Sequence, residues 1–490
     1  MAALVKVTAK VRTDKSGRLL EVPVLLTKQG VFEPLLDYVL SQYHARSQPW
    51  MNRVVFACQL LLEYMQANRG LYSSPTVLFS NFVNKLSLGT INHDGHDPSG
   101  LYWLPRSVSN TNQLISALNG LTDWLVLNNG VSNLNPLEEA SSYQQALNYA
   151  AWHKKNQFNF LGHLKPHGLS DMVKKTRKLR GKRDVIKVDD DAIAFSEAMF
   201  KPFFIDGLGS AKDYRVRLRD QLIVLLMHGA GVRESDALHL WVEDVYEDPD
   251  DCNSVIVRLF HPEDGKAPNN WRGRNKQQTR SAYLAEVFGL RSRNQLTGTA
   301  RVGWKTRIVD HSDNYIQLCW FPSYLGQLFR QLWREYLRLL LPLERFHPYA
   351  FVSFSVTTLG QPLTLNAFNC NYRAALSRIG LTASKVEGLS PHAHRHAFGR
   401  RLTEAGLDPI LIKKALHHAS LSSQLVYTQP GIREVTKACH DATSRLDGIQ
   451  HPTFKEEVVL SWKDILREGF DDIDPRGLFS GHQPSFGSRE

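Results

Sequence analysis

Hydrophobic positions change their spacing along the chain, and each change predicts a different kind of element. Residues 1–30 alternate apolar and polar side chains on both sides of a turn signal at 14–17, which predicts an N-terminal arm of short strands. From Phe32 to about Lys165 the apolar residues recur at helical spacing. The predicted helices span residues 34–40, 50–68, 78–86, 110–127 and 137–154. This pattern predicts a helical N-terminal domain at 31–167, although helical bundles of many functions share it.

The second half of the chain combines helical spacing with strand-like runs. An apolar helix around 222–227 stops at Gly229-Ala230-Gly231, and two more helices are predicted at 325–341 and 365–379. Strand-like runs lie at 255–260, 306–309 and 315–320. We interpret 261–304 as an insertion between strands that contains a short helix near 281–288. The predicted fold class is therefore mainly α with a small β-sheet (α+β).

A run of basic residues separates the two halves. It lies between Gly168 and Asp191 and contains Lys174, Lys175, Arg177, Lys178, Arg180, Lys182, Arg183 and Lys187. Such a run is usually a solvated linker, and we place a basic linker at 168–190. The second domain is then expected at 191–445. A C-terminal tail follows at 446–490, and its Gly, Pro and Ser content after Asp471 predicts partial disorder.

Composition narrows the classes of function. The formal net charge is +11 and the isoelectric point is about 9.3, which favours an anionic polymer as partner, although an ordinary basic enzyme has the same balance. The cysteines are scattered, without a C-x-x-C pair, at Cys58, Cys252, Cys319, Cys370 and Cys439. This argues against a disulfide scaffold or zinc knuckle and suits a reducing cytoplasm. No signal peptide is expected, because the stretch MAALVKVTAKVRTDKSG has no apolar core of sufficient length. No membrane span is expected either, because the apolar run LRLLLPL is short and contains Pro342.

The stretch 389–428 has the clearest local signals. Pro391 suits the first turn of a helix, and Gly406 suits the end of that helix. Asp408-Pro409 then predicts a second helix that ends near His417-His418. On the first helix His392 and Arg395 are three residues apart, so they share a face.

The residue types in this stretch suit phosphoryl transfer to a tyrosine nucleophile. Arg395 offers a planar fork for phosphate oxygens, a histidine donates to phosphate or moves a proton, and Tyr427 can form a phosphoester. The alternative is zinc bound by His392, His394, His396, His417 and His418. Helical positions two apart point to opposite sides, and no Cys or acidic residue completes a ligand set, so we predict no metal site.

These residues resemble the C-terminal signature of the tyrosine recombinase (phage integrase) family. That signature reads roughly H-x-x-R-H, an A-G helix end, L-G-H and Y-T. The corresponding residues here are His392-Ala393-His394-Arg395-His396, Ala405-Gly406, Leu416-His417-His418 and Tyr427-Thr428. His418 follows His392 by 26 positions and precedes Tyr427 by 9, as the family leads us to expect. One departure is His417, which stands where the family usually has Gly and disfavours a tight turn.

A second resemblance lies upstream, around Arg233. The sequence GAGVRESDALHLWVEDV resembles the family's first arginine motif, with Asp236 where Glu is common. We expect an amphipathic helix after Arg233, which precedes His392 by 159 positions, in the order typical of the family.

Family members also have a lysine in a hairpin turn after the strand that corresponds to 255–260. Three residues here are candidates, namely Lys266, Lys276 and Lys305. We choose Lys305, because it directly precedes the strand-like run 306–309, and Lys266 is the runner-up.

The resemblance implies a site-specific DNA recombinase or integrase with a site made of Arg233, Lys305, His392, Arg395, His418 and Tyr427. Tyr427 would attack a DNA phosphodiester and form a 3′-phosphotyrosyl bond, while the two arginines stabilise the charge on the phosphate. Lys305 would protonate the leaving 5′-oxygen, His392 would accept the tyrosine proton, and His418 would bond the phosphate. Bond energy is conserved in such a step, so no ATP, metal or other cofactor is implied.

The resemblance also implies partners and a setting. The expected partner is double-stranded DNA, on which the chain would self-associate as a dimer or tetramer, with accessory proteins of a mobile element. The helical domain 31–167 would be a core-binding domain, and the basic run would contact backbone phosphates. The expected location is the nucleoid in a bacterial cytoplasm. Two alternatives stay open: a non-catalytic DNA-binding relative, and a type IB topoisomerase, which shares the chemistry but needs no partner strand.

Overall fold

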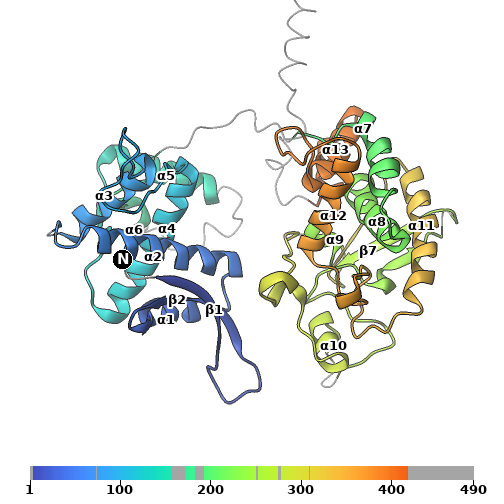
Figure 1. Cartoon of the computed structure of the whole chain (residues 1–490), viewed down its shortest axis with the longest axis horizontal. Coiled ribbons are helices and arrows are strands. Elements are labelled where there is room, and N and C mark those ends of the chain that lie inside the picture. Colours follow the sequence, from blue (N-terminus) through green and yellow to red (C-terminus); the bar gives the residue numbers. More distant parts are fainter. Residues whose placement is uncertain are drawn as a thin grey trace, which may run out of the picture. The chain divides into compact units, whose positions relative to one another are not determined.

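The computed structural model describes residues 4–72, 74–156, 171–182, 193–249, 252–273, 277–307 and 309–417. Helices dominate this part of the chain, and its strands form three small antiparallel sheets (Figure 1). The predicted fold class, mainly α with a small sheet, is confirmed. None of the helices in these ranges combines the length and the apolar character that crossing a membrane requires.

The alternation in the first thirty residues forms a β-hairpin. Strand β1 (Val5–Val11) pairs with β2 (Leu20–Thr27), and β2 pairs with the short β3 (Gly30–Val31). Val22, Val24 and Leu25 of β2 are buried in a hydrophobic core that they share with the helices that follow. The hairpin is therefore packed into the N-terminal core.

Five helices follow the hairpin: α1 (Glu33–Ser41), α2 (Gln48–Ala67), α3 (Pro75–Leu88), α4 (Val108–Asn129) and α5 (Ser142–Asn156). Local signals explain their limits, because α1, α2 and α3 have Pro in their first turn and α4 is followed by Gly130 in the left-handed conformation. The fifth helix begins later than predicted. Leu137–Glu139 is instead strand β4, because it pairs with β5 (Lys175–Arg177).

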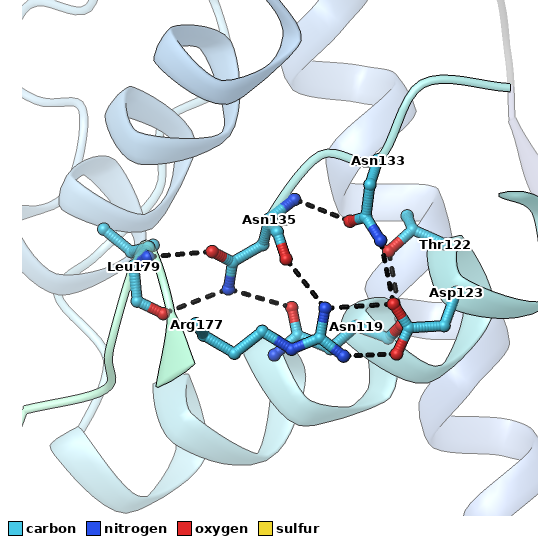
Figure 2. A network of polar contacts seen from close by, with 7 residues as sticks. All are labelled: Asn119, Thr122, Asp123, Asn133, Asn135, Arg177 and Leu179. Carbon is cyan, nitrogen blue, oxygen red and sulfur yellow. Dashed lines mark hydrogen bonds and ion pairs between the residues drawn. The ribbon is translucent and has the colours of Figure 1, made fainter. Parts of the chain in front are cut away.

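Residues 171–182, which we assigned to a linker, are anchored to the N-terminal fold (Figure 2). Arg177 donates to both carboxylate oxygens of Asp123 on α4, with an Nη1–Oδ1 distance of 2.9 Å, and to the carbonyl of Asn135 at 2.7 Å. The Asn135 side chain in turn accepts from the backbone N–H of Leu179 at 2.8 Å and donates to its carbonyl at 3.0 Å. Together with α6 (Asp171–Lys174) and β5, these contacts order this part of the basic run.

The second hydrophobic core forms around helix α8 (Tyr214–Ala230), which contacts both α11 (Tyr324–Leu340) and α13 (Pro391–Glu404) (Figure 1). Residues 222–227 are at most 1% exposed, because α8 is covered on all sides. The remaining helical segments are α7 (Glu197–Pro202), η2 (Phe203–Leu208), α9 (Glu234–Ala237), η3 (Val242–Asp244), α10 (Arg280–Val287), η5 (Arg293–Gln295), η6 (Gly298–Ala300), η7 (Val356–Thr358), α12 (Leu365–Arg378) and α14 (Pro409–Ala415).

The sheet of this half has the order β6 (Val245–Glu247), β7 (Val255–Phe260), β8 (Tyr315–Gln317). The predicted strand at 306–309 is wrong, since the described residues of that run form no strand and β7 pairs with β8 instead. The expected amphipathic helix after Arg233 is also wrong, because α9 has one turn and the apolar Leu238 and Leu240 enter the core from irregular backbone. The short helix predicted inside 261–304 is confirmed as α10.

Several histidines are buried in this second core. His394 of α13 is fully buried, bonds the Tyr372 hydroxyl at 3.0 Å and lies 3.2 Å from His228 of α8 between the ring nitrogens. Burial lowers the pKa of His228 and of His347 to about 4, lowers that of His239 to about 3, and also lowers the pKa of His394. The folded chain therefore holds these rings neutral at pH 7.

This burial predicts loss of stability in mild acid. Each ring has a folded-state pKa below its ordinary value of 6.5, so the unfolded chain takes up protons first as the pH falls. The stabilisation is complete above pH 6.5 and is lost progressively toward pH 4. Burial raises the pKa of Glu234 to about 7. This one carboxyl group acts in the opposite direction, because the folded chain binds its proton more tightly than the unfolded chain does. Urea unfolding should show a loss of at least about 2 kcal/mol between pH 6.5 and 4.5.

A variant controls for this effect. His239 bonds the Val302 carbonyl through Nε2 at 3.1 Å, and a glutamine keeps a donor there without titrating. His239→Gln should therefore lower by about one the number of protons that the chain takes up on unfolding in this pH range. A free energy of unfolding that is flat over this pH range would contradict the assignment of neutral buried histidines.

The contacts of Arg177 predict that this basic residue is structural. Arg177→Ala should lower the free energy of unfolding by about 1.5–3 kcal/mol, because it leaves the Asp123 carboxylate without its charged donor. Arg180→Ala is the matched control, since Arg180 is exposed and bonds the Thr176 hydroxyl, and it should cost less than about 0.5 kcal/mol. Equal losses in the two variants, measured by urea unfolding, would show that the Asp123 contact does not order the segment.

Candidate active site

Helix α13 carries His392 and Arg395, and its limits follow the predicted signals. Pro391 occupies its first turn, and Gly406 follows it with a φ of 75°. The side of α13 that carries Ala393, Ala397 and Phe398 is buried in the core, so the position of the helix is set by packing. Asp408 then caps α14 by accepting from the Ile410 N–H at 2.7 Å, as predicted.

Arg395 is held by the backbone at the ends of two other helices. Its Nη1 donates to the carbonyl of Gly231 after α8, and its Nη2 donates to the carbonyl of Leu416 after α14. Gly231 has a φ of 66°, and a Cβ there would collide with the Phe398 ring, so this position requires glycine. Arg395 is 3% exposed, and these bonds fix the orientation of its guanidinium group.

Arg233 lies two residues after Gly231 and is oriented by Asp236. Its Nη1 donates to the Thr306 hydroxyl at 2.8 Å and lies 3.7 Å from Asp236 Oδ2. The Thr306 hydroxyl donates to Asp236 Oδ2 at 2.7 Å, and the Lys305 N–H donates to Asp236 Oδ1 at 3.2 Å. Asp236 is 1% exposed, so one buried carboxylate joins Arg233 to the loop of Lys305.

The candidate lysines lie in different surroundings. The exposed Lys305 is close enough for its charge to lower the pKa of both His392 and Glu234. Lys266 instead lies 3.4 Å from Asp313 Oδ2 through Nζ, and its backbone forms a bridge with Thr279. Lys276 lies outside the described residues. The charge of Lys305 therefore acts on His392, whereas the ammonium group of Lys266 lies beside Asp313.

His392 stands among these cations. Its side chain is exposed, yet the surrounding protein atoms remove part of its water, and this desolvation together with the charges of Arg395, Arg233 and Lys305 lowers its pKa to about 4. His392 is therefore neutral at pH 7 and can accept a proton. His394, two positions away, faces the core and bonds Tyr372, so it does not join His392 in a common set of ligands.

His417 closes α14 in a left-handed conformation. Its φ is 52°, so the turn expected to need glycine forms with a histidine. Its ring is 6% exposed, and its Nε2 lies 3.1 Å from Asp310 Oδ2. Burial lowers the pKa of His417, the Asp310 carboxylate acts in the opposite direction, and the charges of Arg395 and Arg233 add to the lowering. His418 and Tyr427 lie outside the described residues.

Asp236 and Thr306 thus join Arg233 to the backbone of Lys305, and the charges of Arg233, Lys305 and Arg395 all act on His392. Sequence reasoning missed the groups that hold them. Asp236 is part of the arginine motif, and only its place in that motif pointed to a role in the site. Thr306 was expected in a strand, and nothing near Asp310 in the sequence points to its contact with His417, 107 positions away.

Comparisons with known proteins agree on one family. Residues 327–432 match the model of the phage integrase family. A tyrosine recombinase XerD of Corynebacterium glutamicum is 26% identical over 229 residues, which are 46% of this chain and 54% of the relative. A tyrosine recombinase XerC of Lacticaseibacillus casei is 30% identical over 187 residues, which are 35% of this chain and 55% of the relative. The chain spans about half the length of these two relatives.

Among solved structures, the chain is similar to a XerH site-specific recombinase bound to difH substrate in a pre-cleavage complex. It aligns with a TM-score of 0.45 and 14% identity over 82% of both chains. A Tn1549 transposon integrase in complex with transposon right end DNA aligns with a TM-score of 0.34 and 14% identity over 79% of this chain and 99% of that one. The family model covers the residues in which His392, Arg395 and His417 lie, and together with the sequence relatives this match supports a tyrosine recombinase of the phage integrase family.

Proposed function

We propose that the chain is a site-specific DNA recombinase that cuts and rejoins DNA through a 3′-phosphotyrosyl intermediate at Tyr427. The observation that carries the proposal is the arrangement of Arg233 and Arg395, each oriented by the protein before any ligand arrives. Two fixed guanidinium groups next to an exposed histidine suit a phosphodiester, because fixed donors stabilise the charge that develops on its oxygens.

The remaining roles follow from position and charge. Neutral His392 accepts the proton of the attacking Tyr427 hydroxyl, and Lys305 protonates the leaving 5′-oxygen. His418 follows directly on the Leu416-His417 segment that Arg395 holds, so we assign it a hydrogen bond to the phosphate. A 5′-hydroxyl from a second strand then attacks the phosphotyrosine and restores a phosphodiester. Neither ATP nor a metal takes part in this sequence.

We also propose the wider setting. The partner is double-stranded DNA, on which the chain works as a dimer or tetramer to integrate or excise a mobile element, with accessory proteins of that element. The N-terminal helices act as the core-binding domain. Exposed members of the basic run such as Lys174, Lys175 and Lys178 contact backbone phosphates, because the ordered segment around Arg177 holds them on one fold.

Covalent trapping tests the nucleophile. Nicked suicide duplexes that tile the DNA flanking the gene should give a protein–DNA complex that survives a denaturing gel. Tyr427→Phe should bind these duplexes within about twofold of wild type yet form no covalent complex, because it removes only the nucleophilic oxygen. Arg395→Ala should reduce cleavage by about 10²–10³-fold and also weaken binding.

Covalent trapping, combined with duplex binding and with relaxation of supercoiled DNA, separates the alternatives. A wild-type protein that binds a duplex specifically but forms no covalent complex would be a non-catalytic relative. Relaxation of supercoiled DNA without strand exchange would make the chain a topoisomerase. Either result would contradict the proposed function.

A sulfur substitution tests the lysine. Lys305→Ala should slow cleavage by about 10²–10⁴-fold, because it removes the acid that protonates the leaving oxygen. A duplex with a 5′-bridging sulfur needs no such proton, so it should restore the rate. Lys266→Ala is the matched control and should cleave the normal duplex at the wild-type rate, since its ammonium group lies beside Asp313. Sulfur rescue of Lys266→Ala, but not of Lys305→Ala, would reverse the assignment.

A further inference from the structure

We propose that His417 is a positioning residue: its bond to Asp310 ties the segment that leads to His418 and Tyr427 to the loop that carries Lys305. This inference rests on the proposed function. It concerns a residue that departs from the family pattern.

The backbone at His417 gives the first reason. Three helix ends around the site are in the left-handed conformation, at Gly231 (φ 66°), Gly406 (φ 75°) and His417 (φ 52°). Glycine adopts this conformation freely, whereas a residue with a Cβ is disfavoured there. A histidine at the third helix end therefore needs a side-chain contact that offsets the unfavourable free energy of its left-handed backbone.

The side chain has such a contact. The His417 ring is buried, and its Nε2 lies 3.1 Å from Asp310 Oδ2. Since Nε2 is the ring nitrogen that faces the carboxylate, it donates the hydrogen bond and the carboxylate oxygen accepts it. A glycine at 417 would form the turn but could not make this bond.

Asp310 is itself held in place. Its Oδ2 also accepts from the Gln317 N–H at 3.0 Å, and its own N–H donates to the Tyr315 carbonyl at 2.8 Å, so it is fixed to strand β8. Earlier on the same loop, the Lys305 N–H is bonded to the buried Asp236. Lys305 and Asp310 are thus each bonded to a neighbouring element, and Asp310 is a fixed acceptor for His417.

The other side of the segment is held by Arg395. The Leu416 carbonyl accepts from Arg395 Nη2, and the next residue is His417. The chain is therefore gripped at two successive residues, by the backbone of Leu416 toward Arg395 and by the side chain of His417 toward Asp310. These two bonds fix the position of Leu416 and His417, which precede His418, relative to Arg395 and relative to the loop of Lys305.

Three variants test the tie. His417→Gly removes the bond and relieves the left-handed backbone, so the protein should fold with unchanged or higher thermal stability. His417→Gln is the conservative variant, because its amide nitrogen reaches to about where Nε2 lies and donates to Asp310. Asp310→Ala removes the acceptor. Each is measured with wild type for single-turnover cleavage of the trapped suicide duplex at saturating protein, for the Kd of that duplex, and for the unfolding midpoint.

We expect His417→Gly and Asp310→Ala to bind within about twofold of wild type and to cleave at least about tenfold more slowly. His417→Gln should recover most of the rate. The double variant His417→Gly with Asp310→Ala should be no slower than the slower single variant, because both changes break one bond.

A wild-type cleavage rate for His417→Gly would overturn the proposal, as would His417→Gln being as slow as His417→Gly, or additive losses in the double variant. These results leave the proposed function intact, since wild-type protein still cleaves. Failure of wild-type protein to form any covalent complex would overturn the proposed function and the positioning role with it.

Discussion

The buried guanidinium of Arg395 is the group on which the arrangement of the site depends. It lies on α13, and the two carbonyls that it bonds follow α8 and α14, so one side chain joins three helices. The carbonyl ends of helices carry partial negative charge, which suits a cation that has lost most of its water. Gly231 makes this possible, because its left-handed backbone and missing Cβ allow Phe398 to pack against it. Removal of Arg395 would leave helix-end carbonyls buried without a partner, which is why its loss should affect binding as well as chemistry.

Carboxylates complete this arrangement by fixing the cations around His392. Asp236 connects Arg233, through Thr306, to the backbone of Lys305, and Asp310, which is bonded to strand β8, holds His417. Desolvation of the His392 ring, together with the positive charges of Arg395, Arg233 and Lys305, raises the free energy of its protonated form, and the ring stays neutral. The same charges favour a phosphodiester, whose negative oxygens would neutralise them. Binding of an anion and availability of a base therefore have one electrostatic origin.

Local signals carried the predictions that were confirmed. Pro391, Gly406 and Asp408 set the limits of α13 and α14 from their own backbone preferences, and helical spacing found α8 and α11. The errors have long-range causes. Leu137–Glu139 became a strand because β5 is there to pair with it, and residues 306–307 left the strand pattern because Thr306 bonds Asp236 and Arg233. The described part of the basic run, residues 174–182, is bonded to Asp123 and Asn135 of the preceding fold, and the charges of the run give no sign of these contacts. For the site, the family motif supplied the candidate residues, while the residues that hold them had no sequence pattern of their own.

The central claim is that this set of fixed cations serves a tyrosine that bonds covalently to DNA. The most direct test is mass spectrometry of the trapped suicide complex after digestion with nuclease and protease. We expect a nucleotide adduct on the peptide that contains Tyr427, attached through a 3′-phosphate. An adduct on a different residue, or on no residue of the chain, would contradict it.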